Sequence, residues 1–163
     1  MFTRALAASQ TRPGILRFHL VDFFCLMNII DVAAALVFRN GKVLITQRFS
    51  KDHLGGLWEF PGGKREGGET FEDCLRRELD EELKIQVDVS QLVEALTHSY
   101  PEKTVHLRFF QCQWRSGEPV AVGCADFKWV GPLELRQYEF PAADARLLEK
   151  LERASELWGL RAG

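Results

Sequence analysis

The sequence predicts a single mixed α/β domain in which helices pack around a sheet. Its 163 residues are 46% hydrophobic and 27% charged, which is typical of one globular domain with its own core. Short apolar runs of strand length alternate with two longer segments whose apolar residues recur at helical spacing. This mixture of elements along one chain favours helices covering a sheet.

The first predicted element is a β-hairpin. The apolar runs Asp31–Phe38 and Lys42–Arg48 flank a turn that contains Asn40 and Gly41. An Asn-Gly pair between two apolar runs is a strong hairpin signal, because both residues tolerate positive φ. A loop over Phe49–Gly56 is expected to follow the hairpin.

A helix is predicted in the middle of the chain. The short apolar run Leu57–Phe60 ends at Pro61–Gly63, whose glycines predict a tight turn and a close approach of the backbone. Thr70 and Asp73 then resemble a capping box, with Asp in place of Glu or Gln, and the helical pattern continues to about Leu83. Strands are predicted over Leu92–Ser99, Thr104–Trp114 and Asp126–Val130, and a last helix from about Ala142 to Leu157.

Charge and cysteine content exclude several classes of protein. Lys and Arg number 21 against 23 for Asp and Glu, giving a net charge of -2. We therefore expect no stable nucleic-acid partner, although a polyphosphate substrate remains compatible, because one metal ion can supply local positive charge. The four cysteines form no CxxC pair and no zinc-like spacing. Reduced thiols in a cytoplasmic protein are the expectation.

The beginning of the chain is expected to lie outside the domain. The stretch 15–38 is rich in apolar residues, but Arg17, His19, Asp22 and Asp31 interrupt it, so it predicts no membrane span. The first residues carry too short an apolar run for a signal peptide. We interpret residues 1–26 as an extension of unknown role and 27–163 as the domain, with translation from Met27 as the alternative.

The central predicted helix carries an unusual arrangement of carboxylates. At about 100° per residue, Glu78 and Glu82 fall inside the apolar stripe of this helix, and Glu81 lies at its flank. Two like charges directed at the body of a protein are costly unless they have a partner. A hard divalent cation such as Mg²⁺ fits this donor set, and arginine partners are the alternative explanation.

This region resembles a known sequence motif. Gly63, Glu69 and the segment Arg77–Ile85 are similar to the Nudix box, G-x5-E-x7-R-E-U-x-E-E-x-G-U, where U is aliphatic. Lys84 replaces the last glycine, which puts the shape of the helix exit in question rather than the chemistry. Three other segments resemble the MutT-like branch of the family: Ile45–Arg48, Trp58–Lys64 and Phe140–Asp144.

The resemblance implies an α/β/α sandwich around a mixed sheet. It implies hydrolysis of a nucleoside diphosphate linked to another group, above all of a (d)NTP to a (d)NMP and pyrophosphate, including sanitation of oxidised guanine nucleotides such as 8-oxo-dGTP. Alternatives are CTP or another pyrimidine nucleotide, ADP-ribose or a dinucleotide, and a non-catalytic nucleotide-recognition module, which the retained carboxylates disfavour. The protein would be a monomer or a homodimer.

The resemblance also assigns roles to residues of the box. The ligands of Mg²⁺, which Mn²⁺ could replace, would be the Gly62 carbonyl, Glu78, Glu81 and Glu82. Glu78 would in addition orient or deprotonate the attacking water. Arg77 and Glu69 would form an ion pair that positions the helix.

Residues outside the box are expected to bind the substrate. Arg48 matches a substrate-contacting arginine of the MutT-like branch, and Phe60 matches a position of the base pocket. Asp144 matches a position that reads the base, and its alternative role is that of an acidic residue favoured in the first turn of a helix.

Four further residues are weaker candidates. Lys103 and Arg108 are candidates for phosphate contact, with an ordinary surface role as the alternative. The branch also has a metal-binding glutamate in the loop before the late strand, for which Glu118 and Asp126 are the candidates.

Overall fold

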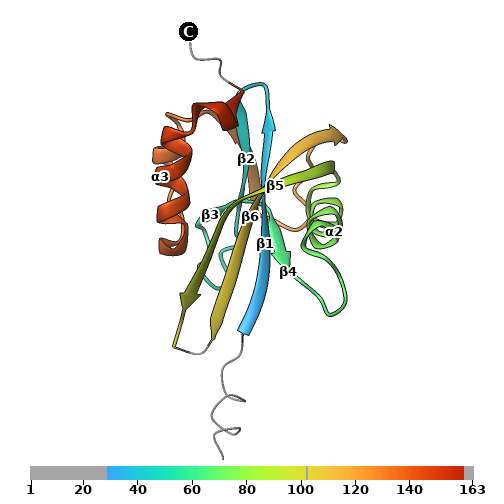
Figure 1. Cartoon of the computed structure of the whole chain (residues 1–163), viewed down its shortest axis with the longest axis vertical. Coiled ribbons are helices and arrows are strands. Elements are labelled where there is room, and N and C mark those ends of the chain that lie inside the picture. The colour runs from blue at the N-terminus through green and yellow to red at the C-terminus, as the bar shows by residue number, and fades with distance from the viewer. Residues whose placement is uncertain (1–28, 102, 160–163) are drawn as a thin grey trace, which may run out of the picture.

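A computed structural model describes residues 29–101 and 103–159 and shows one mixed sheet of seven strands (Figure 1). The strands are β1 (Ile29–Arg39), β2 (Lys42–Gln47), β3 (Trp58–Glu59), β4 (Gly62–Lys64), β5 (Gln86–Ser99), β6 (Thr104–Ser116) and β7 (Asp126–Val130). Their order is β3-β2-β1-β6-β5, with β4 also paired to β1 and β7 to β2. The proposed extension 1–26 lies outside the described residues.

Strand β1 organises the sheet. It runs parallel to β6 from Ile29 to Phe38 and antiparallel to both β2 and β4. The predicted hairpin between β1 and β2 is confirmed, since Asn40 and Gly41 both take positive φ, 53° and 72°. Because β2 pairs with the last residues of β1 and β4 pairs with Val32–Ala34, β1 has neighbours of different origin along one edge.

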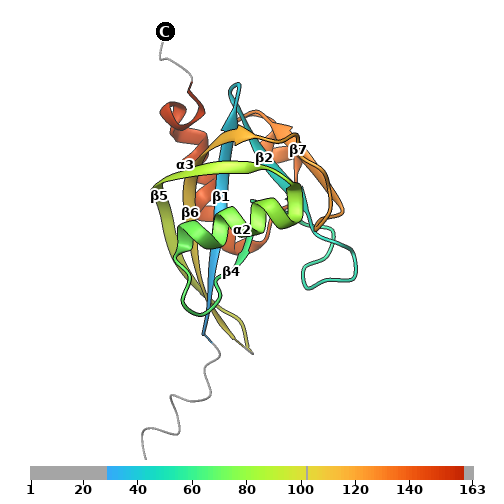
Figure 2. The ribbon, with the colours of Figure 1, turned by 90° about the vertical axis from the view of Figure 1, so that its right-hand side faces the viewer.

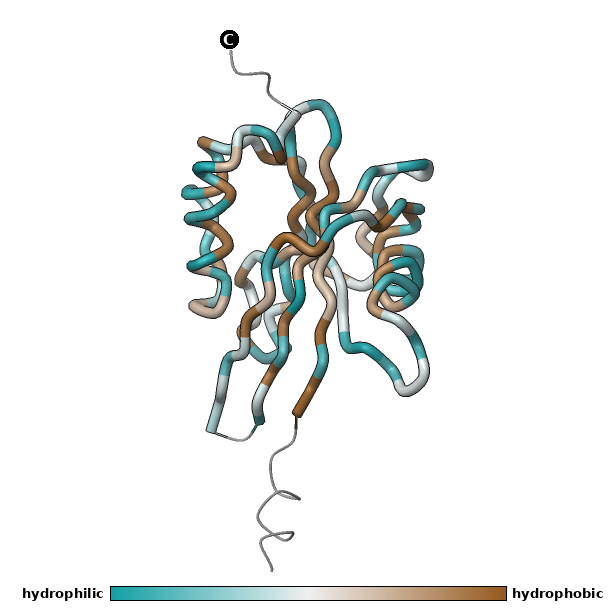
Figure 3. Tube along the Cα trace, viewed as in Figure 1, coloured by the Kyte–Doolittle hydropathy of each residue, from teal (hydrophilic) through white to brown (hydrophobic). Residues whose placement is uncertain are grey.

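The expected α/β/α sandwich is confirmed. Helix α2 (Phe71–Leu83) covers one face of the sheet and helix α3 (Ala145–Arg153) covers the other, as Figures 1 and 2 show. Alternate residues of β1 serve the two layers: Ala35 and Val37 pack in the core under α2, whereas Ala34 and Leu36 pack in the core under α3. A strand covered on both faces is apolar throughout, which explains the hydrophobic centre of the molecule in Figure 3.

The ends of α2 follow from its sequence. Thr70 is the N-cap and accepts a hydrogen bond from the Asp73 backbone N–H (3.1 Å), as the capping box predicts. Lys84, at the position of the missing glycine, takes a left-handed conformation with φ of 58° and ψ of 31°. Its N–H bonds to the Asp80 carbonyl, so the helix exit keeps the geometry that glycine usually provides.

Three boundaries differ from the prediction. Gly62 and Gly63 belong to strand β4 rather than to a tight turn, because they pair with β1. Strand β5 begins earlier than predicted, since irregular pairing between Val89 and Glu94 breaks its alternation. Helix α3 is shorter than predicted: a 3-10 turn, Ala142–Asp144, precedes it, and a 3-10 turn, Ser155–Trp158, follows it.

Two other sequence predictions concern the chain as a whole. Among residues 29–101 and 103–159, no helix is long and apolar enough to cross a membrane. Cys74, Cys112 and Cys124 are buried free thiols, and Cys25 lies outside the described residues. Burial raises the pKa of all three thiols, to about 11 for Cys74 and Cys124 and about 12 for Cys112, which is consistent with inert structural cysteines.

Candidate active site

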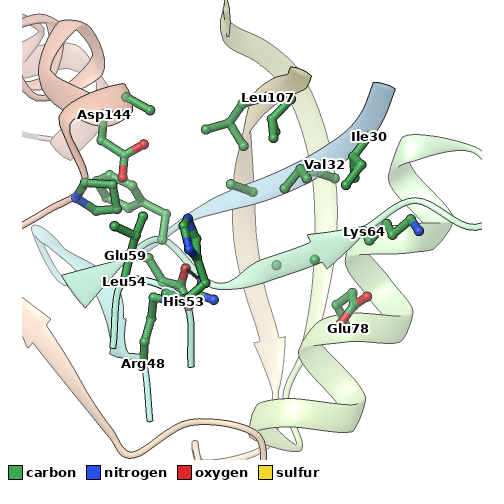
Figure 4. A pocket seen from close by; sticks show the side chains of 18 of the residues that line it. Ile30, Val32, Arg48, His53, Leu54, Glu59, Lys64, Glu78, Leu107 and Asp144 are labelled. Atoms are coloured by element: carbon green, nitrogen blue, oxygen red, sulfur yellow. Dashed lines mark hydrogen bonds and ion pairs between the residues drawn. The ribbon is translucent and has the colours of Figure 1, made fainter. Parts of the chain in front are cut away.

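A cavity of about 440 Å³ lies between the first half of β1, strands β3, β4 and β6, helix α2 and the segment just before α3 (Figure 4). One side of it, here the acidic end, consists of Gly62, Gly63, Glu78 and Glu82. The other side, here the aromatic end, consists of Phe60, Phe109, Pro141 and Asp144. Figure 4 shows Glu78 and Asp144 on opposite sides of the cavity.

The two glycines of the acidic end are required by close packing. A Cβ on Gly62, whose φ is 150°, would lie 2.1 Å from the Ala33 carbonyl oxygen of β1. A Cβ on Gly63 would lie 2.3 Å from the carboxyl carbon of Glu78. Any side chain at Gly63 would therefore occupy the space of the Glu78 carboxylate.

The two carboxylates of the acidic end are held at an electrostatic cost. Burial raises the pKa of Glu78, although Arg77 opposes the shift, and the pKa of Glu82 rises to about 8 because of burial and of the charge on Glu78. Within the described part of the chain, the Glu82 carboxylate has no hydrogen bond or ion pair, and the charge of Arg48 lowers its pKa only in part. Such a pair is stabilised by a cation.

Arg77 links the helix to the segment before it. Its Nε and one terminal nitrogen donate to the two carboxylate oxygens of Glu69, both at 3.0 Å, and this bidentate contact lowers the pKa of Glu69. The other terminal nitrogen donates to Glu78 at 2.9 Å and to Glu81 at 3.3 Å. The Glu81 side chain is 60% exposed and does not line the cavity.

The aromatic end is built from distant segments. Phe60 stacks on Phe140 with ring centroids 5.3 Å apart and meets Phe109 edge-on at 6.0 Å. The Trp58 N–H donates to the Glu139 carbonyl at 2.8 Å, which fixes the segment before α3 against β3.

Asp144 is 4% exposed and is the N-cap residue of α3, yet its side chain makes no capping hydrogen bond. Burial, with a smaller contribution from the charge on Glu59, raises its pKa to about 7. A carboxyl group that is buried beside aromatic rings and free of a capping role is available to a ligand in the cavity.

An ion pair in the cavity wall lies within reach of both ends: the charge on Glu59 acts on Glu82 and on Asp144, and the charge on Arg48 acts on Glu82. Arg48 contacts Glu59 at 2.5 Å, and its Nε donates to the His53 carbonyl at 2.8 Å. Burial nevertheless raises the pKa of Glu59. Arg48 thus joins strand β3 to the loop that follows β2, and all three residues line the cavity.

A profile of the NUDIX domain family matches residues 33–150. The chain belongs to the Nudix family. A CTP pyrophosphohydrolase of Escherichia coli K12 is 37% identical over 123 residues, covering 76% of this chain and 91% of that protein. An 8-oxo-dGTP diphosphatase of Haemophilus influenzae is also 37% identical, over 125 residues, with the same two coverages, 76% and 91%.

Solved structures agree with this assignment. The solution structure of the E. coli ORF135 protein superposes with a TM-score of 0.68 at 34% identity and covers 78% of this chain and 91% of that chain. The MutT protein of methicillin-resistant Staphylococcus aureus 252 gives a TM-score of 0.65 at 32% identity, covering 78% of this chain and 98% of that chain. The protein is a Nudix hydrolase, and hydrolases of this family are generally dependent on a divalent metal.

The cavity of this Nudix hydrolase collects most of the residues singled out in the sequence. It is lined by Gly62, Glu78, Glu82, Arg48, Phe60 and Asp144, whereas Glu69, Arg77 and Glu81 lie beside it. Of the two basic candidates, Lys103 lines the cavity, and Arg108 instead stacks on Phe71 with 4.3 Å between guanidinium and ring centroid.

The two candidates for a further acidic ligand lie elsewhere. Glu118 pairs with Arg39 at an exposed site, and Asp126 accepts a hydrogen bond from the Phe127 N–H. Neither lines the cavity. The loop between β6 and β7 places Gly123 in the wall of the cavity instead.

Sequence reasoning missed Glu59 and His53, both of which line the cavity. Glu59 lies in a short strand whose burial depends on β2 and on the distant segment around Glu139. The only local signal was its position directly before Phe60, next to a glycine pair and an acidic helix.

The acidic end fits a divalent cation. Glu78 and Glu82 line the cavity from successive turns of α2, and burial raises the pKa of both, although Arg77 opposes the shift at Glu78 and Arg48 opposes it at Glu82. Oxygen donors of this kind suit Mg²⁺ or Mn²⁺. In the described part of the chain, no three acidic, His or Cys side chains already form a metal-binding group. Glu78 and Glu82 are the two cavity-lining carboxylates that lie one turn apart on the same helix.

Proposed function

We propose that this Nudix hydrolase cleaves nucleoside triphosphates to the monophosphate and pyrophosphate with Mg²⁺, Mn²⁺ being able to substitute. The observation that supports this most directly is that one cavity joins a pair of partly buried carboxylates to an aromatic and acidic wall. The first can hold metal and phosphate, and the second can hold a base. A nucleotide is the ligand class that needs both.

In this proposal the acidic end performs the chemistry. Glu78, Glu82 and the Gly62 carbonyl bind the metal, and Glu81 joins them by turning from its contact with Arg77. Glu78 also orients or deprotonates the attacking water, and its contact with Arg77 fixes the direction of its carboxylate. Bound Mg²⁺ would neutralise phosphate oxygens and lower the pKa of the water.

The aromatic end selects the nucleotide. Phe60, which lines the cavity and already stacks on Phe140, supplies apolar contact for a base, and Asp144 hydrogen-bonds the base edge. Arg48 and Lys103 contribute positive charge to a cavity that is otherwise rich in carboxylates. Because Arg48 already pairs with Glu59, its contact with the substrate is shared with an internal role.

The comparisons favour two candidate substrates. Relatives of equal identity are named an 8-oxo-dGTP diphosphatase and a CTP pyrophosphohydrolase. We propose 8-oxo-dGTP, and thus sanitation of oxidised nucleotides, as the first candidate, with CTP as the second. Both present N–H donors that the Asp144 carboxylate can accept.

The test is a nucleotide panel with Mg²⁺ in which pyrophosphate and nucleoside monophosphate are both measured. The panel contains the dNTPs, the NTPs, 8-oxo-dGTP, ADP-ribose and a diadenosine polyphosphate, with Glu82→Gln as the blank. We expect kcat/KM to be highest for 8-oxo-dGTP or CTP and pyrophosphate to equal monophosphate in amount. Preference for ADP-ribose or the dinucleotide would refute the triphosphate assignment, and no turnover above the blank would refute catalysis on this panel.

A further inference from the structure

The loop between β6 and β7 packs against the end of helix α2. The Val120 N–H donates to the Leu83 carbonyl at 2.9 Å, and the N–H groups of Val122 and Gly123 both donate to the Glu82 carbonyl at 3.0 Å. The last carbonyls of a helix have no partner within the helix. The loop supplies these partners and so fixes its own backbone beside Glu82.

Gly123 is the residue of this loop that lies against the Glu82 side chain. A Cβ at position 123 would lie 2.6 Å from Cγ, 2.8 Å from Cβ and 3.0 Å from Cα of Glu82. The φ of Gly123 is outside the left-handed region, so the backbone conformation does not call for glycine there. Glycine is needed instead because the Glu82 side chain occupies the space that a Cβ at position 123 would take.

The same relation holds at the other carboxylate of the acidic end. Gly63 also has an ordinary φ, and its missing side chain leaves the room that the Glu78 carboxylate fills. Each of the two inward carboxylates is thus bounded by a glycine. Gly63 belongs to the Nudix box, whereas Gly123 lies outside it, in a loop that the sequence motif does not describe.

We propose that Gly123 is a positioning residue for Glu82. By lacking a side chain and by bonding to the Glu82 carbonyl, it lets the loop close on the helix and holds the Glu82 carboxylate towards Glu78. This inference rests on the proposed role of Glu82 in metal binding. In this proposal the β6–β7 loop supports the acidic end through Gly123 but supplies no metal ligand itself.

The experiment compares Mn²⁺ binding by the full chain, without nucleotide, in the wild type and in Gly123→Ala, by electron paramagnetic resonance of free Mn²⁺. The added methyl must displace Glu82 or the loop, so we expect the Kd for Mn²⁺ to rise by about tenfold or more, as when residues that orient metal ligands are changed. Gly67→Ala is the matched control, because a Cβ there meets nothing within 4 Å and φ is ordinary. Its Kd should stay within about twofold of the wild type on the same grounds.

A double-mutant cycle with Glu82→Gln separates positioning from general damage. If Gly123 acts through Glu82, Gly123→Ala should have no further effect on Mn²⁺ binding once Glu82 is Gln. An equal loss in both backgrounds, or loss of the cooperative thermal transition in Gly123→Ala, would assign Gly123 a purely structural role and overturn the proposal.

The outcomes also distinguish this proposal from the proposed function. If Glu82→Gln binds Mn²⁺ as well as the wild type, the metal role of Glu82 fails and the proposed function with it. If Glu82→Gln weakens binding and Gly123→Ala does not, the proposed function stands and the positioning role of Gly123 is refuted.

Discussion

The two ends of the cavity are built in different ways. Three of the four residues of the acidic end come from the continuous stretch between Gly62 and Glu78, and Glu82 follows one helical turn later. The aromatic end brings together Phe60, Phe109 and Asp144 from segments far apart in the sequence. In the proposed function, a local motif thus specifies the chemistry of the site, whereas the choice of base depends on how distant segments meet.

The largest expected effect is at the acidic end. Glu78→Gln keeps the size of the side chain but removes its charge, so kcat should fall at least about a hundredfold while the fold is retained. Steady-state kinetics and circular dichroism on the same sample measure both. Asp80→Asn, at an exposed position of the same helix, is the control and should keep wild-type kcat. A kcat near the wild-type value in Glu78→Gln would contradict the catalytic assignment.

The next effect is at the aromatic end and concerns selectivity. Asp144→Asn exchanges a carboxylate for an amide, so kcat/KM for the preferred nucleotide should fall by about 10- to 100-fold, the range for a hydrogen bond to a charged group. Turnover of poor substrates should change little, since the acidic end is intact. Competition between the preferred nucleotide and a poor one in a single reaction measures the ratio of their kcat/KM values directly. An equal fall for every nucleotide would show that Asp144 does not read the base.

Asp144 also makes stability depend on pH. Its pKa is raised from 3.8 to about 7 by burial and by Glu59, so the folded protein binds this proton more tightly than the unfolded chain does. Stability is therefore lost as pH rises from 3.8 towards about 7 and stays lost above that.

Asp144→Asn removes this loss. The free energy of unfolding of the variant minus that of the wild type should be about 2 kcal/mol larger at pH 8 than at pH 5, at about 1.4 kcal/mol per pKa unit. Urea unfolding of both proteins at the two pH values measures it. Because both proteins retain Glu82, the difference between them reports on Asp144 alone. If this difference were the same at pH 5 and pH 8, the pKa of Asp144 would be ordinary.

The smallest effect is expected outside the cavity. Lys84 holds a left-handed conformation, which costs a non-glycine residue about 1 kcal/mol. Lys84→Gly removes this strain but loses a favourable cation at the helix end and makes the unfolded chain more flexible. We expect a net gain of up to about 0.5 kcal/mol in the free energy of unfolding with unchanged kcat, checked by thermal unfolding. A loss of stability would mean that the lysine charge outweighs the backbone strain.

Much of the acidic end could be predicted from the sequence because its determinants are local. The helical period placed Glu78 and Glu82 inside the apolar stripe, and Thr70 marked the start of the helix. The sequence left the conformation of Lys84 open, because a lysine at the position of the usual glycine does not itself signal the left-handed exit that the structure shows.

The aromatic end could be predicted only in part. Asp144 was compatible with a helix-end role and with base reading, and the missing capping hydrogen bond distinguishes them only in three dimensions. Glu59 and Gly123 were not identified from the sequence. Glu59 contacts Arg48 and Gly123 contacts Glu82, and no sequence pattern links either pair. The irregular pairing of β5 likewise concealed its first residues.

The most direct test of the central claim is a crystal structure with Mg²⁺ and a non-hydrolysable α,β-methylene nucleoside triphosphate. The two-ended cavity predicts one bound nucleotide, with Mg²⁺ on Glu78 and Glu82 and with the base between Phe60 and Asp144. A base bound away from Phe60 and Asp144, or a metal bound away from Glu78 and Glu82, would contradict the claim that these two ends form a single site.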